Sequence, residues 1–284
     1  MVEYIMLNNY KEFRSIMSQS LIVPIGEKVK LSDFDPSYKG EYKRKRDVQS
    51  KLQKTLNKII ELQELLYSES NNALLIVLQA MDAGGKDGTI KHVMGAVNPQ
   101  GCDVKNFKVP SAEESAHDFL WRYHIATPRK GKIIIFNRSY YEDVLVVRVH
   151  NLVPKSVWSK RYDQINNFEQ MLVENGTTIL KFYLHISKDE QKKRFEDRLS
   201  RSDKHWKFSD ADLREREYWD EYMKAFEMVL NKCNTKISPW HIVPANNKWY
   251  RDLVIGQTVV KALEGLNMKY PDPERDFSDI EIKD

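Results

Sequence analysis

Apolar residues along the chain follow two patterns, short apolar runs and stretches with an apolar residue at every third or fourth position. The short runs predict strands at residues 73–79, 103–109, 132–137, 178–185 and 239–243. Helical spacing predicts helices near residues 86–97, 111–126, 155–174, 188–200, 210–232 and 247–266. Strands that alternate with helices predict an α/β fold, in which a parallel five-stranded sheet is flanked by helices.

A longer helical pattern precedes the first strand. Leu52, Ile59 and Leu66 belong to an apolar series at steps of three and four, which predicts a helix over residues 40–70. Basic residues gather near its start at 43–46. They form either a solvated helix face or a basic arm near a polyanion.

The pattern also suggests how the chain is divided. We predict an N-terminal helical extension at residues 1–70, a core at 71–270 with a helical lid at about 188–212, and a tail at 271–284. The tail sequence YPDPERDFSDIEIKD is acidic and contains prolines, as expected of a surface extension.

Composition narrows the class of protein. The 284 residues are 41% hydrophobic and 30% charged, which is typical of a globular protein, and no apolar run is long enough to span a bilayer. The first residues, MVEYIMLNNYKEF, lack the features of a signal peptide. Only Cys102 and Cys233 are present, so we expect no disulfide framework and a cytoplasmic location. The net charge of +4 suits an anionic ligand.

The first strand leads into the sequence LQAMDAGGKDGTIKHV, which resembles a phosphate-binding loop. Glycine allows the backbone to approach phosphate oxygens, and a following helix start favours anions. Lys86 would supply a mobile positive charge for terminal phosphates. The residues predicted to bind phosphate or nucleotide here are Ala83, Gly84, Gly85, Asp87, Gly88 and Thr89.

The loop departs from the Walker A pattern G-x-x-x-x-G-K-[ST]. Ala80 replaces the first glycine and Asp87 replaces the Ser/Thr, while Asp82 adds a carboxylate within the loop. Mg²⁺ prefers carboxylate and phosphate oxygens, so Asp82 and Asp87 are the candidate metal residues. Asp82 could also orient the attacking phosphate or act as a base. Asp87 could simply complement the helix dipole.

The third strand places further polar groups at its carboxyl end, where ligands bind in such sheets. Asn137 occupies the position where a Walker B motif has Asp, and Arg138 follows it. We predict that Asn137 contributes to phosphate or nucleotide binding and that Arg138 is catalytic. Glu142 and Asp143 come next, with a role at a helix start as the simpler interpretation.

Cationic side chains elsewhere complete the candidate site. Arg122 would either reach phosphate or pair with Asp118 one turn earlier on the same helix. Arg194, Arg198 and Arg201 share one face of the predicted lid helix. Arginine suits phosphate contacts and transition-state charge, so we predict that Arg194 and Arg198 are catalytic, with a surface salt-bridge network as the alternative. Lys204 and Lys207 extend the basic character, and Lys207 is a predicted phosphate contact.

Several segments together resemble the polyphosphate kinase type-2 family. They are QAMDAGGKDGTIKHVMGAVNPQGC, FLWRYH, FNRSYYEDVLVVRVH and DEQKKRFEDRLSRSDKHWKFSDADLREREYWDEYMKAFE, within a resemblance over roughly residues 35–270. The resemblance implies a P-loop kinase core with a helical lid. It also implies Mg²⁺-dependent reversible transfer between polyphosphate and nucleotides, with Asp82 positioning metal and activating the acceptor phosphate. It further implies that Arg122, Arg138, Arg194 and Arg198 contact phosphates.

Two details refine this interpretation. Many family members have Asp where this chain has Asn137, and the loop wording is most similar to the branch that phosphorylates both AMP and ADP. We therefore expect ADP-to-ATP and AMP-to-ADP transfer, with Mg²⁺ or Mn²⁺, and with adenine and also guanine nucleotides as substrates. We expect no nucleic-acid or membrane partner, and a homodimer or homotetramer.

Two other functions share these features. An ATP-dependent nucleotide or nucleoside kinase of the thymidylate kinase type would have the same core and differ in its phosphate donor. A polyanion-binding protein without turnover would use the same Lys and Arg residues, but it would have no use for the glycine loop.

Overall fold

A computed structural model describes residues 21–276, 280 and 282 of the chain. The first 20 residues of the predicted extension lie outside the described residues, as do 277–279, 281, 283 and 284 of the predicted tail. Residues 271–276 of that tail are exposed.

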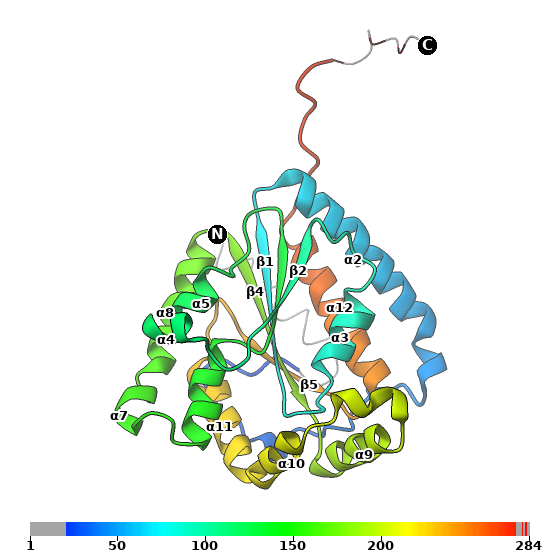
Figure 1. The fold of residues 1–284 in the computed structure, drawn as a ribbon. Helices are drawn as coiled ribbons and strands as arrows, with labels where there is room; N and C mark the ends of the chain where they lie inside the picture. Colours follow the sequence, from blue (N-terminus) through cyan, green and yellow to red (C-terminus); the bar gives the residue numbers. More distant parts are fainter. Residues whose placement is uncertain (1–20, 277–279, 281, 283–284) are drawn as a thin grey trace.

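One parallel sheet forms the centre of the molecule (Figure 1). Its strands are β1 (Ala73–Gln79), β2 (Cys102–Asn106), β3 (Ile133–Asn137), β4 (Thr177–His185) and β5 (Trp240–Pro244), in the spatial order β2-β3-β1-β4-β5. Every residue of β1 is buried, as expected for a central parallel strand with helices on both faces. The predicted five-stranded α/β fold is confirmed.

Helices cover both faces of the sheet (Figure 1). One face carries α2 (Gln49–Glu69), α3 (Lys86–Val93) and α12 (Lys248–Glu264). The other carries α8 (Arg161–Glu174) and α11 (Trp219–Lys232). The predicted lid contains α9 (Lys188–Leu199), the 3-10 helix η4 (Ser202–Lys207) and the start of α10 (Asp210–Glu217), below the carboxyl ends of the strands in Figure 1. Short helical turns complete the described chain: η1 (Leu31–Asp33), η2 (Lys45–Asp47), α4 (Ala112–Ala116), α5 (Trp121–His124), η3 (Tyr140–Val144), α6 (Val146–Val149) and α7 (Lys155–Trp158).

The helix predicted over residues 40–70 starts later than expected. The side chain of Asp47 accepts hydrogen bonds from the backbone N–H groups of Lys43 (2.9 Å) and Arg44 (3.0 Å). These bonds close the separate turn η2, and α2 begins only at Gln49. Most of the basic residues therefore lie in a turn before the helix.

Other predicted elements are divided or shortened. Asp118 accepts a hydrogen bond from the Leu120 N–H (2.9 Å), and this local turn separates α4 from α5 within the predicted helix 111–126. The predicted helices 155–174 and 210–232 are likewise each two helices. Strand β2 ends at Asn106, three residues earlier than predicted; the following segment approaches Pro110, which has no N–H for a sheet.

A buried charged network lies beneath the loop after β3. Lys181 and Glu169 are both 0% exposed and form an ion pair of 2.7 Å. Glu169 also accepts hydrogen bonds from the hydroxyls of Tyr140 (2.8 Å) and Tyr141 (2.7 Å). Both tyrosine pKa values are raised, mainly by burial and then by the Glu169 charge, so both hydroxyls stay protonated donors. The network fixes η3, and with it the position of the residues just before it.

Candidate active site

The segment between β1 and α3, residues 80–87, is called the phosphate loop below. Ala83 (φ 59°) and Gly85 (φ 107°) both have left-handed backbone conformations. For alanine this conformation is strained, and such strain is concentrated at functional sites. At Gly84 a Cβ would approach the carbonyl oxygen of Met81 to 2.7 Å, so the turn has no room for a side chain there. Such compact turns are typical of backbone loops whose N–H groups bind an anion.

Lys86, the first residue of α3, lies folded against the loop. It is 9% exposed, and its Nζ donates to the carbonyl oxygen of Ala80 at 3.1 Å. Burial lowers its pKa first, followed by the nearby Arg138 charge, while Asp82 and Glu142 act in the opposite direction. The ammonium therefore lies buried against the loop, among charges of both signs.

Asp82 and Arg138 form the central ion pair of the site. Arg138 Nη2 lies 2.8 Å from Asp82 Oδ1, although 56 residues separate the two in sequence. Arg138 has φ 64°, a second strained non-glycine conformation beside the loop. The backbone carbonyl of Asp82 also accepts from Gln191 Nε2 of α9 at 2.9 Å. The predicted loop carboxylate and the predicted strand-end arginine thus lie together.

Asp87 and Asn137 also meet at the carboxyl ends of the strands. Asn137 Nδ2 donates to Asp87 Oδ1 at 2.9 Å and to Asn106 Oδ1, at the end of β2, at 2.7 Å. Asn137 therefore contacts the carboxylate of Asp87 directly. The sequence pattern did not predict this contact. Thr89, two residues further along α3, is 2% exposed, and its Oγ1 has no hydrogen-bond partner among the described residues.

Arg194 of α9 is buried and binds the backbone. Its Nη1 donates to the carbonyl oxygens of Ala83 (2.9 Å) and Gly84 (3.1 Å), and its Nε pairs with Glu190 at 2.8 Å. Its Nη2 donates to the carbonyl oxygens of Ala245 and Asn246 beyond β5. Arg194 therefore connects the phosphate loop, the lid helix and the end of β5.

Arg198, one helical turn beyond Arg194, has a different environment. It is paired with Asp212 of α10 at 3.2 Å, and both side chains are 22% exposed. The pKa of Asp212 is raised, mainly by burial and next by the charge of Asp82. Arg198 is also more exposed than Arg194, which is 7% exposed and bound to backbone carbonyls.

Comparisons with known proteins agree with this geometry. A family model described as polyphosphate kinase 2 matches residues 42–271. The chain belongs to the polyphosphate kinase 2 family.

Named relatives cover nearly the whole chain. The chain is 49% identical to an AMP/ADP-polyphosphate phosphotransferase of Meiothermus ruber, over 94% of this chain and 100% of that protein. It is 46% identical to an ADP-polyphosphate phosphotransferase of Rhodopseudomonas palustris, over 90% and 93%. The crystal structure of polyphosphate kinase 2 from Arthrobacter aurescens TC1 superposes with a TM-score of 0.88 at 44% identity, covering 92% of this chain and 95% of that one.

The carboxylate and amide oxygens near the loop could bind a hard divalent cation if phosphate oxygens of the substrate supplied further ligands. Among the described residues, no cluster of three or more His, Cys, Asp or Glu side chains could hold a metal. Asp82, Asp87 and the amide oxygens of Asn137 and Asn106 are nevertheless the oxygen types that Mg²⁺ accepts, and Mg²⁺ is usually held by one or two carboxylates with water and phosphate oxygens. A bound metal would therefore depend on the phosphates of the substrate.

Two predicted phosphate contacts, Arg122 and Lys207, form no hydrogen bond or ion pair with the loop among the described residues. Arg122 is 5% exposed, donates to the Lys108 carbonyl (2.8 Å) and pairs with Glu114 (3.3 Å), so the alternative pairing with Asp118 is wrong. Its guanidinium also covers the ring of Phe107. Lys207 is exposed and lies 4.8 Å from the ring of Trp206. Phosphate roles for Arg122 and Lys207 stay predictions.

Sequence reasoning missed Arg251 and gave Glu142 only a helix-start role. Arg251, on α12, is 1% exposed and contacts the loop at Gly85. A signal was present, since an Arg-Asp pair interrupts the apolar pattern of the predicted helix 247–266. Burial raises the pKa of Glu142, while the nearby charges of Arg138 and Lys86 lower it, so Glu142 belongs to the same charged cluster.

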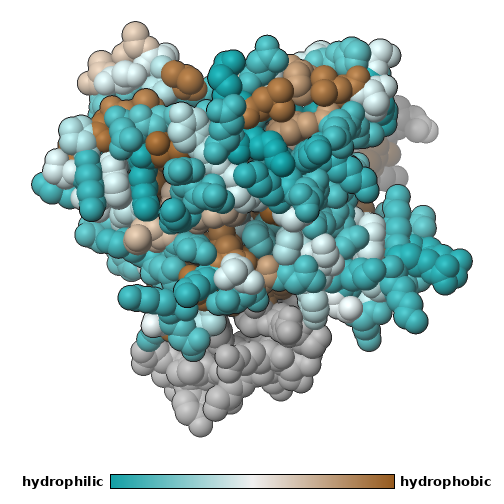
Figure 2. Space-filling view, turned by 90° about the horizontal axis from the view of Figure 1, so that it is seen from below, coloured by the Kyte–Doolittle hydropathy of each residue, from teal (hydrophilic) through white to brown (hydrophobic). Residues whose placement is uncertain are grey.

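The surface around the site is polar. Viewed toward the carboxyl ends of the strands, it is mostly hydrophilic with scattered hydrophobic areas (Figure 2). No helix of the described chain has the length and apolar content needed to cross a bilayer.

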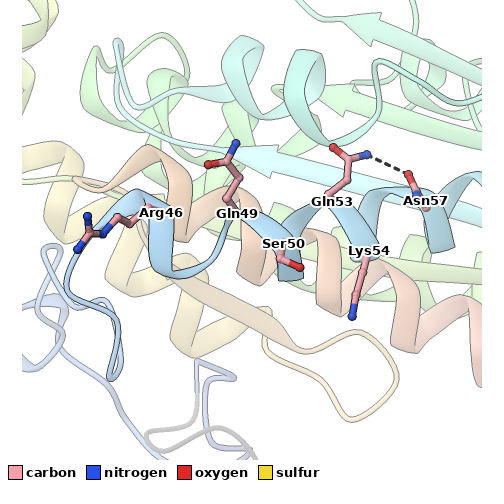
Figure 3. Close-up of a pocket in the computed structure, with 6 residues that line it drawn as sticks. All are labelled: Arg46, Gln49, Ser50, Gln53, Lys54 and Asn57. Carbon is pink, nitrogen blue, oxygen red and sulfur yellow. Dashed lines mark hydrogen bonds between the residues drawn. The ribbon is translucent and has the colours of Figure 1, made fainter.

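A separate open pocket lies along α2 (Figure 3), lined by Arg46, Gln49, Ser50, Gln53, Lys54 and Asn57. Gln53 donates a hydrogen bond to Asn57 at 2.9 Å, so some polar groups of the lining are already paired with one another. None of the lining residues belongs to the phosphate loop, so this pocket is not the phosphoryl-transfer site.

Proposed function

We propose that the protein transfers phosphoryl groups reversibly between inorganic polyphosphate and nucleotides, converting ADP to ATP and AMP to ADP. The observation that carries the proposal is the Asp82–Arg138 pair of 2.8 Å next to the buried Lys86, in a loop shaped for phosphate. Family membership and the named activities of the two relatives support the same reaction.

The reaction requires positioning and charge neutralisation more than covalent chemistry by the protein. An oxygen of the acceptor nucleotide phosphate attacks the terminal phosphorus of polyphosphate, and the shortened chain leaves with the bond electrons. Lys86 and the loop N–H groups hold the transferred group, and Arg138 stabilises charge that develops on it. Since the attacking phosphate oxygen is already anionic, Asp82 serves to orient the acceptor and the metal.

We propose Mg²⁺ as the cofactor, with Mn²⁺ as a substitute. Asp82 and Asp87 would hold it, with Asn137 orienting Asp87 through the 2.9 Å hydrogen bond. When bound, the cation would neutralise part of the phosphate charge.

The lid supplies the remaining cations in this proposal. Arg198 is paired with Asp212 in this structure and would exchange this carboxylate for a phosphate when substrate binds. Arg194 would act mainly by holding the loop carbonyls of Ala83 and Gly84. Guanine nucleotides as substrates, a homodimer or homotetramer, and a cytoplasmic location remain predictions.

The test is an assay of the purified protein with long-chain polyphosphate, Mg²⁺ and, in separate reactions, AMP, ADP, GMP and GDP. We expect ADP from AMP and ATP from ADP, and loss of both products when EDTA removes the metal. A parallel reaction replaces polyphosphate with ATP and uses AMP as acceptor. Faster transfer from ATP than from polyphosphate would instead support the thymidylate kinase type of enzyme.

A further inference from the structure

The face of α12 that meets the phosphate loop carries cations that the proposed reaction does not yet use. Lys248 is the first residue of α12, and Arg251 follows one turn later, so both share one face of the helix. A Cβ at Gly85 would overlap Nη1 of Arg251, and it would lie 3.6 Å from Nη1 of Arg194. The loop and the start of α12 are thus in direct contact.

Arg251 has one hydrogen-bonding group without a partner. Its Nε and Nη2 donate to Asp252 Oδ1 at 2.9 and 2.7 Å, whereas the buried Nη1 has no partner among the described residues. An unpaired donor of a buried charged group is costly, so it calls for an explanation such as a ligand. This nitrogen lies at Gly85, within the loop that binds phosphate in the proposed reaction.

The dipole of α12 gives its amino end a partial positive charge, which favours an anion. Asn247, the residue in the cap position, makes no side-chain cap and donates its amide to the Ser37 carbonyl at 2.9 Å. Lys248 is exposed at this end. Burial lowers its pKa, followed by the charge of Arg194, with Lys204 and Arg251 acting in the same direction and Asp197 against them. More positive than negative charge therefore surrounds Lys248.

We propose that Lys248 and Arg251 form a second phosphate subsite at the amino end of α12, which binds the phosphate group of polyphosphate next to the one in the loop. This inference rests on the proposed function. A polyphosphate chain carries anionic oxygens on consecutive groups and can occupy two adjoining cationic sites. A nucleotide acceptor continues instead into its sugar and base.

The exposed Lys248 gives the cleanest test, because its replacement leaves the core intact. We expect Lys248→Ala to raise the KM for long-chain polyphosphate roughly three- to tenfold, with little change in the KM for AMP or ADP. The slope of log KM for polyphosphate against log salt concentration should decrease by about one, because one fewer cation contacts the chain. Lys248→Arg should stay close to wild type, since it retains the charge.

Lys130→Ala is the matched control, because Lys130 is exposed in the turn before β3, at the amino end of that strand, whereas the phosphate loop lies at the carboxyl ends of the strands. A calorimetric titration with inorganic tripolyphosphate, without nucleotide, should show the same loss of affinity for Lys248→Ala and none for Lys130→Ala. The subsite is excluded if wild type uses polyphosphate while Lys248→Ala keeps its polyphosphate KM and tripolyphosphate affinity. A selective rise in the nucleotide KM would also overturn it. Absence of polyphosphate-dependent transfer in wild type would instead reject the proposed function.

Discussion

The phosphate loop and the lid hold their charged side chains in different ways. In the loop, Lys86 is buried and Asp82 is fixed by Arg138 from another strand end. In the lid, Arg201 pairs with Asp203 at 2.8 Å while the two side chains are 50% and 64% exposed. Exposed pairs of this kind contribute little to stability and exchange partners readily. The charged groups of the loop are held in place without a substrate, whereas this pair in the predicted lid is held only weakly, and we expect it to rearrange when a substrate binds.

The boundary between these regions falls within one helix. Arg194 is buried and bound to loop carbonyls, and Arg198 one turn later is paired with a single carboxylate. Arginines on the same face of one helix can therefore have different roles. Arg194 supports the loop through these carbonyls, and we expect Arg198 to contact the substrate.

The largest expected effect comes from breaking the loop. Lys86→Ala should lower kcat by about 10²–10³-fold, because it removes a cation that acts on the transferred phosphate. Steady-state kinetics with polyphosphate and ADP measures this, and circular dichroism checks that the fold is kept. Activity above about half of wild type would show that the loop does not hold the reacting phosphate.

The next effect separates the two loop carboxylates. Asp82→Asn should lower kcat roughly 10–10²-fold, more than Asp87→Asn, because only Asp82 pairs with Arg138 inside the loop. Activity measured across a Mg²⁺ titration should show a shifted metal requirement for Asp82→Asn. Equal and mild effects of both substitutions would remove Asp82 from the centre of the site.

The comparison within α9 is sharpened by matched substitutions of its two arginines. Arg194→Lys should lower the free energy of unfolding by about 1–3 kcal/mol, since lysine leaves several buried carbonyls without donors. Arg198→Lys should change it by less than about 1 kcal/mol while lowering kcat. Urea unfolding and kinetics on both variants provide the measurement. If the two variants lost the same stability, the division of tasks would be wrong.

The smallest expected effect concerns the framework behind Arg138. Burial raises the pKa of Asp143 to about 6 from its ordinary 3.8, against the opposing Arg161 charge. The protonated form therefore favours the folded state below about pH 4, and this contribution is lost as pH rises through about 6. Urea unfolding from pH 4 to 7 should show wild type losing stability relative to Asp143→Asn over that window. A constant difference between the two proteins would contradict a raised pKa.

Much of the fold could be read from local patterns. The run ALLIVLQ is short, apolar and followed by turn residues, as expected of a buried strand, and its predicted limits, 73–79, match β1. Helix limits were less predictable where a polar side chain bonds a nearby N–H, as Asp47 and Asp118 do. Such local bonds compete with helix formation without changing the apolar spacing.

The sequence by itself determined the family, through several segments that resemble it. It also determined the parallel α/β sheet and the phosphate loop, because both depend on residues that lie close together along the chain. Only the tertiary structure decided which charges meet. It brought Arg138 to Asp82 and Asn137 to Asp87, and it turned Arg194 toward the loop carbonyls. It also brought Arg251, more than 160 residues away, against Gly85. These contacts depend on strand order and helix packing, which bring distant segments together at the carboxyl ends of the strands. The spacing of residues along the chain does not indicate them.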